Sequence, residues 1–97
     1  MYRLEYLPSF EVDLIEAEDY LYEFSPAATY KLTEALDGQM ATVVEHPLIY
    51  PAYRYNKKYR LMTLPYQYLC FYRVDEAAKV IKVYRLLREM QNVSEML

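Results

Sequence analysis

Two strand-forming runs follow one another in residues 66–88, which read YQYLCFYRVDEAAKVIKVYRLLR. Both are rich in β-branched and aromatic residues, which favour extended backbone, and Asp75-Glu76 predicts a turn between them. We expect strands at 66–74 and 79–87. The first run is apolar at successive positions, so both of its faces should be buried, as in a central strand covered by helices on one side.

The residues before this pair add a third strand. Residues 59–64 (YRLMTL) are predicted to be extended, and Pro65 marks the next turn. Residues 47–58 hold two prolines among tyrosines and bases and predict an irregular connection. The strands follow one another directly, so we expect a three-stranded antiparallel meander. Residues 89–97 predict a short amphipathic tail of one or two helical turns.

The N-terminal residues 2–7 alternate apolar and charged side chains, which predicts a short strand with Tyr2, Leu4 and Tyr6 on one face. Ser9 is a good N-cap for a helix that ends near residue 24. Apolar residues at helical spacing predict its buried stripe: Phe10, Leu14, Ala17, Leu21 and Phe24. Acids are expected on its opposite, exposed side: Glu11, Asp13, Glu16, Glu18, Asp19 and Glu23.

A second helix is predicted directly after Ser25-Pro26, because serine is a good N-cap and proline fits the first helical turn. Its buried stripe is formed by Leu32, Leu36, Met40 and Val43, and it ends before His46-Pro47. Gly38, the only glycine, indicates a kink or a close helix contact. The predicted order is β-α-α-β-β-β: an α+β fold in which a helical hairpin packs on an antiparallel sheet, forming one domain over residues 1–97.

Composition narrows the class of protein. The 97 residues are 55% hydrophobic and 26% charged, which excludes a disordered chain. No segment resembles a membrane span or a signal peptide, and the lone Cys70 excludes an internal disulfide, so we expect a cytoplasmic protein that is not bound to a membrane.

The net charge of −3 argues against a dedicated nucleic-acid binder. Residues 1–49 carry two bases against ten acids, whereas residues 50–97 carry nine bases against four acids, so an anionic partner should meet the second half.

Several chemistries are excluded by what the sequence lacks. One glycine cannot build a phosphate-binding loop, and one histidine with one cysteine cannot supply a metal site, so we expect no cofactor and no metal. His46, at a helix end, is read as structural in preference to an acid–base catalyst. Cys70, in the predicted central strand, is read as a buried apolar residue.

Four local patterns together resemble the RelE/ParE toxin superfamily, and they cover nearly the whole chain. They are Pro47-x-x-Tyr50-Pro51, Tyr59-Arg60, Tyr68-x-x-Phe71-Tyr72-x-Val74-Asp75-Glu76, and Val80-Ile81-x-Val83-Tyr84-Arg85-Leu86-Leu87-Arg88. The resemblance implies the microbial RNase-like sheet-and-helix fold. It also implies the growth-inhibiting, plasmid-stabilising toxin half of a bacterial type II toxin–antitoxin pair, held inactive by a cognate antitoxin.

The superfamily has two activities on one fold. RelE-type members cut mRNA on the ribosome, whereas ParE-type members poison DNA gyrase. The RelE pattern has an arginine directly after the tyrosine of the central strand, but here Leu69 follows Tyr68, which argues against a nuclease. We therefore expect a ParE-like toxin that acts by binding gyrase. The first alternative is a metal-independent, ribosome-dependent mRNA interferase, and the second is a non-toxic regulator that only binds its antitoxin.

If the chain is an interferase, the resemblance implies that Arg60 and Arg88 bind phosphate and that Tyr84 positions the attacking 2′-hydroxyl. Arg85 and Arg88 could equally pair with carboxylates of an antitoxin or with Glu89. Eight tyrosines lie between residues 50 and 84, interleaved with bases. They could stack on RNA bases, but packing and antitoxin contact explain them better.

Overall fold

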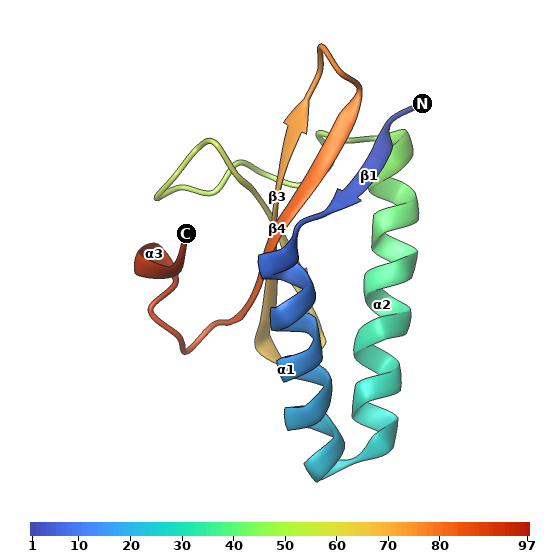
Figure 1. Cartoon of the computed structure of the whole chain (residues 1–97), viewed down its shortest axis with the longest axis vertical. Coiled ribbons are helices and arrows are strands. Elements are labelled where there is room, and N and C mark those ends of the chain that lie inside the picture. The colour runs from blue at the N-terminus through green and yellow to red at the C-terminus, as the bar shows by residue number, and fades with distance from the viewer.

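The computed structural model describes all residues, 1–97, and its main core lies between a helical hairpin and one face of a sheet (Figure 1). The hairpin consists of α1 (Pro8–Phe24) and α2 (Pro26–Glu45). The strands are β1 (Arg3–Tyr6), β2 (Arg60–Leu64), β3 (Tyr68–Asp75) and β4 (Val80–Arg88). A short 3-10 turn, η1 (Pro65–Gln67), joins β2 to β3, and α3 (Val93–Met96) ends the chain. This is the predicted α+β fold.

The sheet has the order β1-β4-β3-β2. Strands β2, β3 and β4 form the predicted antiparallel meander, but β1 pairs with β4 in parallel, from Arg3 opposite Val80 to Tyr6 opposite Val83. The sheet is therefore mixed, whereas the sequence predicted an antiparallel one. The reason is visible in Figure 1: α1 continues the direction of β1, α2 returns, and the three later strands alternate, so β4 runs the same way as β1.

The first helix begins two residues earlier than predicted, because its N-cap is Leu7 and not Ser9. Leu7, in extended backbone, occupies the N-cap position, and Pro8 opens the helix. Proline suits this position because its missing N–H would have no helical partner there, and it holds the preceding residue extended. The prediction that Ser9 caps the helix is wrong: the Ser9 hydroxyl donates to the carbonyl oxygen of Tyr84 at 2.7 Å and so ties α1 to β4.

The predicted stripe of α1 is mostly confirmed. Phe10, Ala17 and Leu21 are buried and Leu14 is partly buried, but Phe24 is 70% exposed because it lies in the last turn, at the tip of the hairpin. The stripe of α2 is confirmed in full. Gly38 makes no close helix contact, because a Cβ added there would have no neighbour within 4 Å.

None of the helices has both the length and the hydropathy that a membrane span requires.

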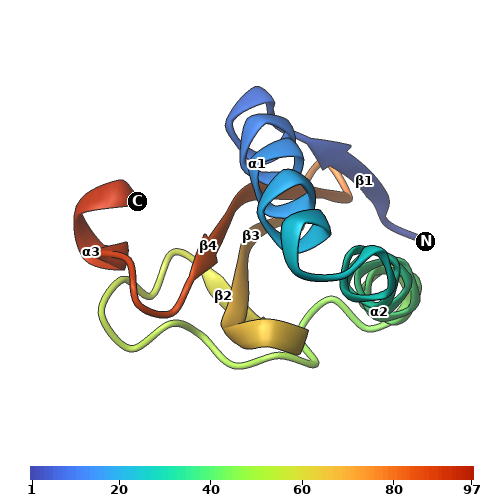
Figure 2. The ribbon, with the colours of Figure 1, turned by 90° about the horizontal axis from the view of Figure 1, so that it is seen from below.

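Two cores lie on opposite faces of the sheet. The larger one, facing the helices, takes Cys70 and Tyr72 from β3. The smaller one takes Phe71, and it is closed by Tyr53 and Tyr59 from the segment between α2 and β2 and by Val93 from α3. Figure 2 shows the helical hairpin on one side of the sheet and α3 on the other. The central strand is therefore covered on both faces, and most of the tyrosines expected to pack do so.

Candidate functional site

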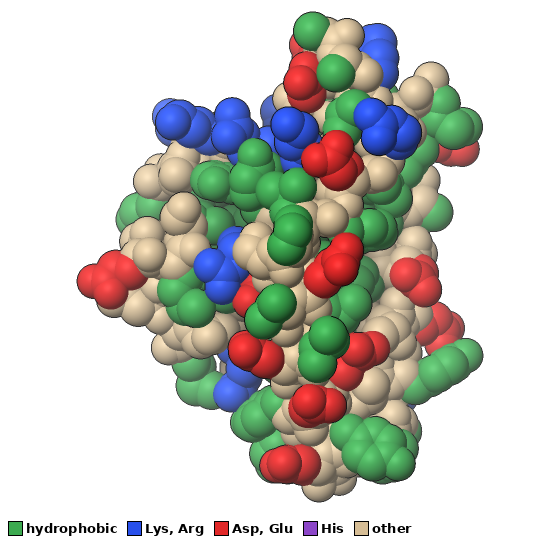
Figure 3. All heavy atoms as spheres, in the orientation of Figure 1, with side chains coloured by type: hydrophobic (Ala, Val, Ile, Leu, Met, Phe, Trp, Pro, Cys, Tyr) green, Lys and Arg blue, Asp and Glu red, His purple; other side chains and the backbone are tan.

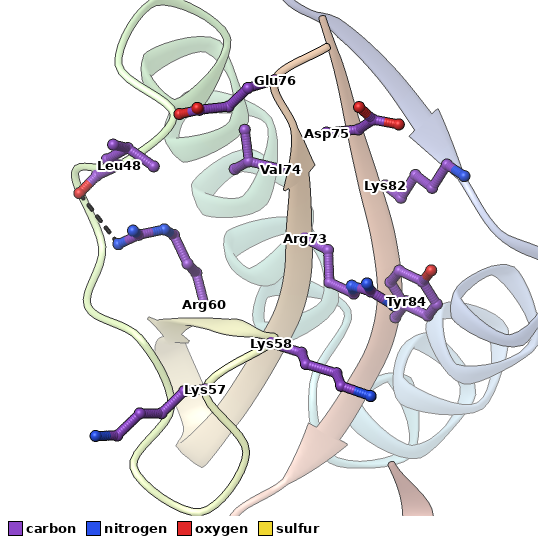
Figure 4. A pocket seen from close by; sticks show the side chains of 10 residues that line it. All are labelled: Leu48, Lys57, Lys58, Arg60, Arg73, Val74, Asp75, Glu76, Lys82 and Tyr84. Atoms are coloured by element: carbon purple, nitrogen blue, oxygen red, sulfur yellow. Dashed lines mark hydrogen bonds between the residues drawn. The ribbon is translucent and has the colours of Figure 1, made fainter. Parts of the chain in front are cut away.

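A basic cleft of about 620 Å³ opens beside β3 and β4 (Figure 4). The segment before β2 supplies Leu48, Lys57 and Lys58, and β2 supplies Arg60. Strands β3 and β4 and the turn between them supply Arg73, Val74, Asp75, Glu76, Lys82 and Tyr84. Five bases thus face two acids, and the Asp75 carboxylate already accepts the backbone N–H of Ala78. The surplus positive charge lies in the half of the chain where the sequence predicted it.

Arg60 lies in this cleft but is held by backbone carbonyls. Its Nη1 donates to the carbonyl oxygen of Tyr50 at 2.7 Å and to that of Leu48 at 3.5 Å. The Tyr50 hydroxyl in turn accepts from Nε2 of Gln39 on α2. Arg60 therefore fixes the irregular segment against the sheet, which limits how freely its guanidinium can turn toward a ligand.

Arg73 is the cation that sequence reasoning missed. Its guanidinium lies 5.9 Å from the ring centre of Tyr59 and 5.6 Å from that of Tyr84, and the two rings meet edge to face at 5.2 Å. Arg73 is exposed, so this is a cation held in place by aromatic rings at the surface of the cleft. No local pattern in the sequence marks Arg73, because the rings that hold it and its cross-strand neighbour Lys82 come from other segments of the chain.

Arg88 lies on the other face of the sheet. Its guanidinium sits 4.3 Å from the ring centre of Tyr20 on α1. A β-bulge explains this position: Tyr72 pairs with Val83 but Phe71 pairs with Arg85, so β4 has one extra residue, Tyr84, at this point. Simple alternation would put Tyr84 and Arg88 on one face, and the bulge reverses the alternation between them. The structure thus brings Arg60 and Tyr84 together in one cleft and leaves Arg88 outside it.

The family model for the ParE toxin of the type II toxin-antitoxin system parDE matches residues 4–93. The chain belongs to the ParE toxin family. It is thus the toxin of a type II toxin–antitoxin system. No curated protein matches it in sequence.

Solved structures share the fold of this ParE-family chain. One is described as the chromosomal ParDE TA system from P. aeruginosa, with a TM-score of 0.71 and 21% identity, covering 91% of this chain and 96% of that one. Another is the intact E. coli RelBE toxin-antitoxin complex, with a TM-score of 0.67 and 16% identity, covering 94% of this chain and 100% of that one. Both confirm the predicted toxin fold.

The ParE-family chain also contains one ion pair, which joins buried Asp13 to partly exposed Arg85. Asp13 was predicted on the exposed side of α1 but is 7% exposed. Its carboxylate accepts from Nε and Nη2 of Arg85 at 2.7 and 3.0 Å and from the backbone N–H of Leu86. The remaining Nη1 of Arg85 donates to the carbonyl of Met96. The hydrogen bonds that Arg85 donates to Asp13 raise the pKa of Arg85. Through the contact with Met96, the pair joins α1, β4 and α3.

The remaining reactive groups of this ParE-family toxin lie away from the cleft. Cys70 is fully buried, and burial raises the pKa of its thiol, so it packs as the predicted small apolar residue. Exposed His46 follows the last residue of α2, at its C-cap. No group of three His, Cys, Asp or Glu residues is arranged to hold a metal ion. The cleft itself offers five cationic side chains, the Tyr84 phenol and two carboxylates.

Proposed function

We propose that this toxin inhibits growth by binding DNA gyrase and does not cut RNA. The observation that carries the proposal is the separation of the three side chains expected from the resemblance to carry out RNA cleavage: Arg60 and Tyr84 line the cleft, whereas Arg88 lies on the helix-covered face. The Arg60 guanidinium also already donates hydrogen bonds to the carbonyls of Tyr50 and Leu48, which limits its use in binding phosphate. The match to the ParE family model supports a toxin of the ParE branch. Resemblance to that branch implies DNA gyrase as the target.

We also propose that a cognate antitoxin holds the toxin inactive. Two of the structural neighbours are a ParDE system and a RelBE complex, both of which pair a toxin with an antitoxin. Large exposed apolar side chains, among them Val12 and Ile15 on α1, give a partner protein apolar surface to cover.

One observation favours the alternative, a ribosome-dependent mRNA interferase. The basic cleft holds Arg73 close to the rings of Tyr59 and Tyr84, and Lys82 also lines the cleft (Figure 4). Cations there could stabilise the charge on a phosphate while the 2′-hydroxyl attacks phosphorus and the 5′-oxygen leaves with a proton. This mechanism would use Arg73 in place of Arg88, so it differs from the residue set expected from sequence.

Two assays with the purified toxin separate these functions. The first measures supercoiling of relaxed plasmid by gyrase, and the second measures cleavage of mRNA on programmed ribosomes. We expect inhibited supercoiling and intact mRNA. Arg73→Ala and Tyr84→Phe should leave the second result unchanged, because no cleavage is present to lose.

Cleavage by the parent toxin that disappears in both variants would overturn the gyrase proposal and establish the interferase. A toxin that binds its antitoxin but affects neither assay would overturn it in favour of the non-toxic regulator.

A further inference from the structure

A second hollow lies at the tip of the helical hairpin, away from the basic cleft. It measures about 280 Å³ and opens between the end of α1, the start of α2 and the β2–β3 turn. Its floor is apolar, because Leu21 and Ala28 are buried there. Its rim is aromatic: Tyr20, Phe24 and Tyr66 are 37%, 70% and 41% exposed. Tyr20 and Phe24 meet edge to face with ring centres 5.0 Å apart.

Arg88 is the only charged side chain that lines this hollow. Its guanidinium is half-buried against the ring of Tyr20, donates no side-chain hydrogen bond within the chain and has no carboxylate within 4.0 Å. By contrast, Arg85 three residues earlier is fully engaged by Asp13 and Met96. A partly desolvated guanidinium with free donors, set among apolar rings, is suited to a carboxylate that arrives together with an apolar side chain.

The surroundings favour a protein partner over a nucleic acid. Helix α1 supplies three of the residues that line the hollow, Tyr20, Leu21 and Phe24. It also carries four exposed acids, and acidic side chains spread over the side of the molecule seen in Figure 3, where α1 lies: Glu11, Glu16, Asp19 and Glu23. They would repel a phosphate backbone. Tyrosine and arginine around a small apolar floor are the residue types that contribute most to protein–protein binding.

The backbone also presents Tyr66 toward this site. Tyr66 and Gln67 both have positive φ, 62° and 64°, a left-handed conformation that side chains other than glycine rarely adopt. The turn is held by the carbonyl of Gln67, which accepts the backbone N–H of Glu89 next to Arg88. The rim of the hollow and its single cation are therefore fixed relative to one another.

We propose that this hollow is an anchor site for the cognate antitoxin: an apolar side chain of the antitoxin fills the space between Phe24 and Tyr66, and a neighbouring Asp or Glu pairs with Arg88. The inference rests on the proposed antitoxin partner and names where and by what chemistry it binds. Because the hollow and the basic cleft lie on opposite faces of the sheet, this contact can be altered without touching the cleft.

The test measures the affinity of the purified toxin for the antitoxin encoded beside it, by isothermal titration calorimetry. We expect Arg88→Glu and Phe24→Ala each to weaken binding at least about tenfold, since each removes a central contact of the anchor. Each has a matched control. Arg54→Ala removes another arginine that stacks on a tyrosine, 5.0 Å from the ring centre of Tyr55, and Tyr30→Ala removes an aromatic ring that is 68% exposed. Both controls should bind like the parent.

The outcomes separate this inference from the function on which it rests. Parent affinity in both Arg88→Glu and Phe24→Ala would overturn the anchor site and leave the antitoxin proposal intact. Failure of the parent toxin itself to bind would overturn the antitoxin proposal. Loss of gyrase inhibition with unchanged antitoxin affinity would also overturn the anchor site, because the hollow would then serve the target. Phe24 is exposed, so its variant reports on binding even where a substitution at Arg88 harms folding.

Discussion

At the scale of single residues, the Asp13–Arg85 pair is asymmetric, because Asp13 is buried while the Arg85 side chain is 22% exposed. We expect Arg85→Met to lower the free energy of unfolding by about 3–5 kcal/mol, since it leaves a buried carboxylate with only the Leu86 N–H. Asp13→Ala should cost less, about 1–3 kcal/mol, since water can reach the stranded guanidinium. Urea unfolding of both variants and of the double variant checks this. Costs that simply add in the double variant would contradict a direct interaction.

The left-handed residue Gln67 gives a prediction of the opposite sign. Its φ of 64° costs about 1–2 kcal/mol for a residue with a Cβ. Gln67→Gly should therefore raise the free energy of unfolding, by up to about 1 kcal/mol after the added flexibility of glycine in the unfolded chain. Gln67→Val should lower it, because a β-branched side chain fits this conformation poorly. Thermal unfolding of the two variants should give melting temperatures on opposite sides of the parent.

At the scale of elements, helix α2 stabilises the fold through the apolar stripe that it buries. Leu36 is 4% exposed, so Leu36→Ala should cost about 2–5 kcal/mol from lost burial and the cavity left behind. Val12 on the outer side of α1 is 55% exposed, and Val12→Ala should change stability by less than about 0.5 kcal/mol. Chemical denaturation measures both. Equal effects would mean that the helices do not present these faces to the sheet.

The elements also show how far the sequence could predict the fold. Helix α2 was predicted with its full stripe because 20 residues of regular spacing outweigh one glycine. Asp13 was misplaced because its charge was taken to mean exposure, although it lies three residues after Phe10 and four before Ala17 on the buried side of α1. The partner that buries its carboxylate lies 72 residues away. Arg88 was grouped with Tyr84 because the family resemblance implied it, and the β-bulge that turns the two side chains to opposite faces leaves no local signal in the sequence. The burial of Asp13 and the facing of Arg88 both depend on how β4 pairs with its neighbours, which the sequence of one element does not contain.

At the scale of the whole molecule, the buried phenol of Tyr72 and the buried thiol of Cys70 make the stability of the fold sensitive to high pH. Burial raises the pKa of Tyr72 from 10.0 to about 12 and also raises that of Cys70 from its usual 9.0. A raised pKa in the folded state means that stability is complete below the unfolded value and falls as pH rises past it. Stability should therefore decline from about pH 9, and at pH 11 Tyr72 alone should account for about 1–2 kcal/mol.

Urea unfolding at pH 8 and pH 11 tests this expectation. Cys70→Ala should remove the part of the decline that begins near pH 9 and leave the part due to Tyr72. Ionised Tyr72 could no longer donate to the carbonyl of Pro47 at 2.9 Å, so the segment after α2 should become more accessible to protease at the higher pH. A decline unchanged by Cys70→Ala would show that the thiol ionises as readily in the folded chain as in the unfolded one.

The parallel pairing of β1 with β4 also bears on how the chain is made. Arg3 lies opposite Val80, and Ser9 and Asp13 are bound to Tyr84 and to Arg85, so the start of the chain has its partners near the end. Such a high contact order means that a nascent chain that stops short of β4 has a hairpin and a strand with nothing to pack on. Folding of this domain thus waits until β4 has been synthesised, so a nascent chain that has not yet reached β4 lacks the toxic conformation.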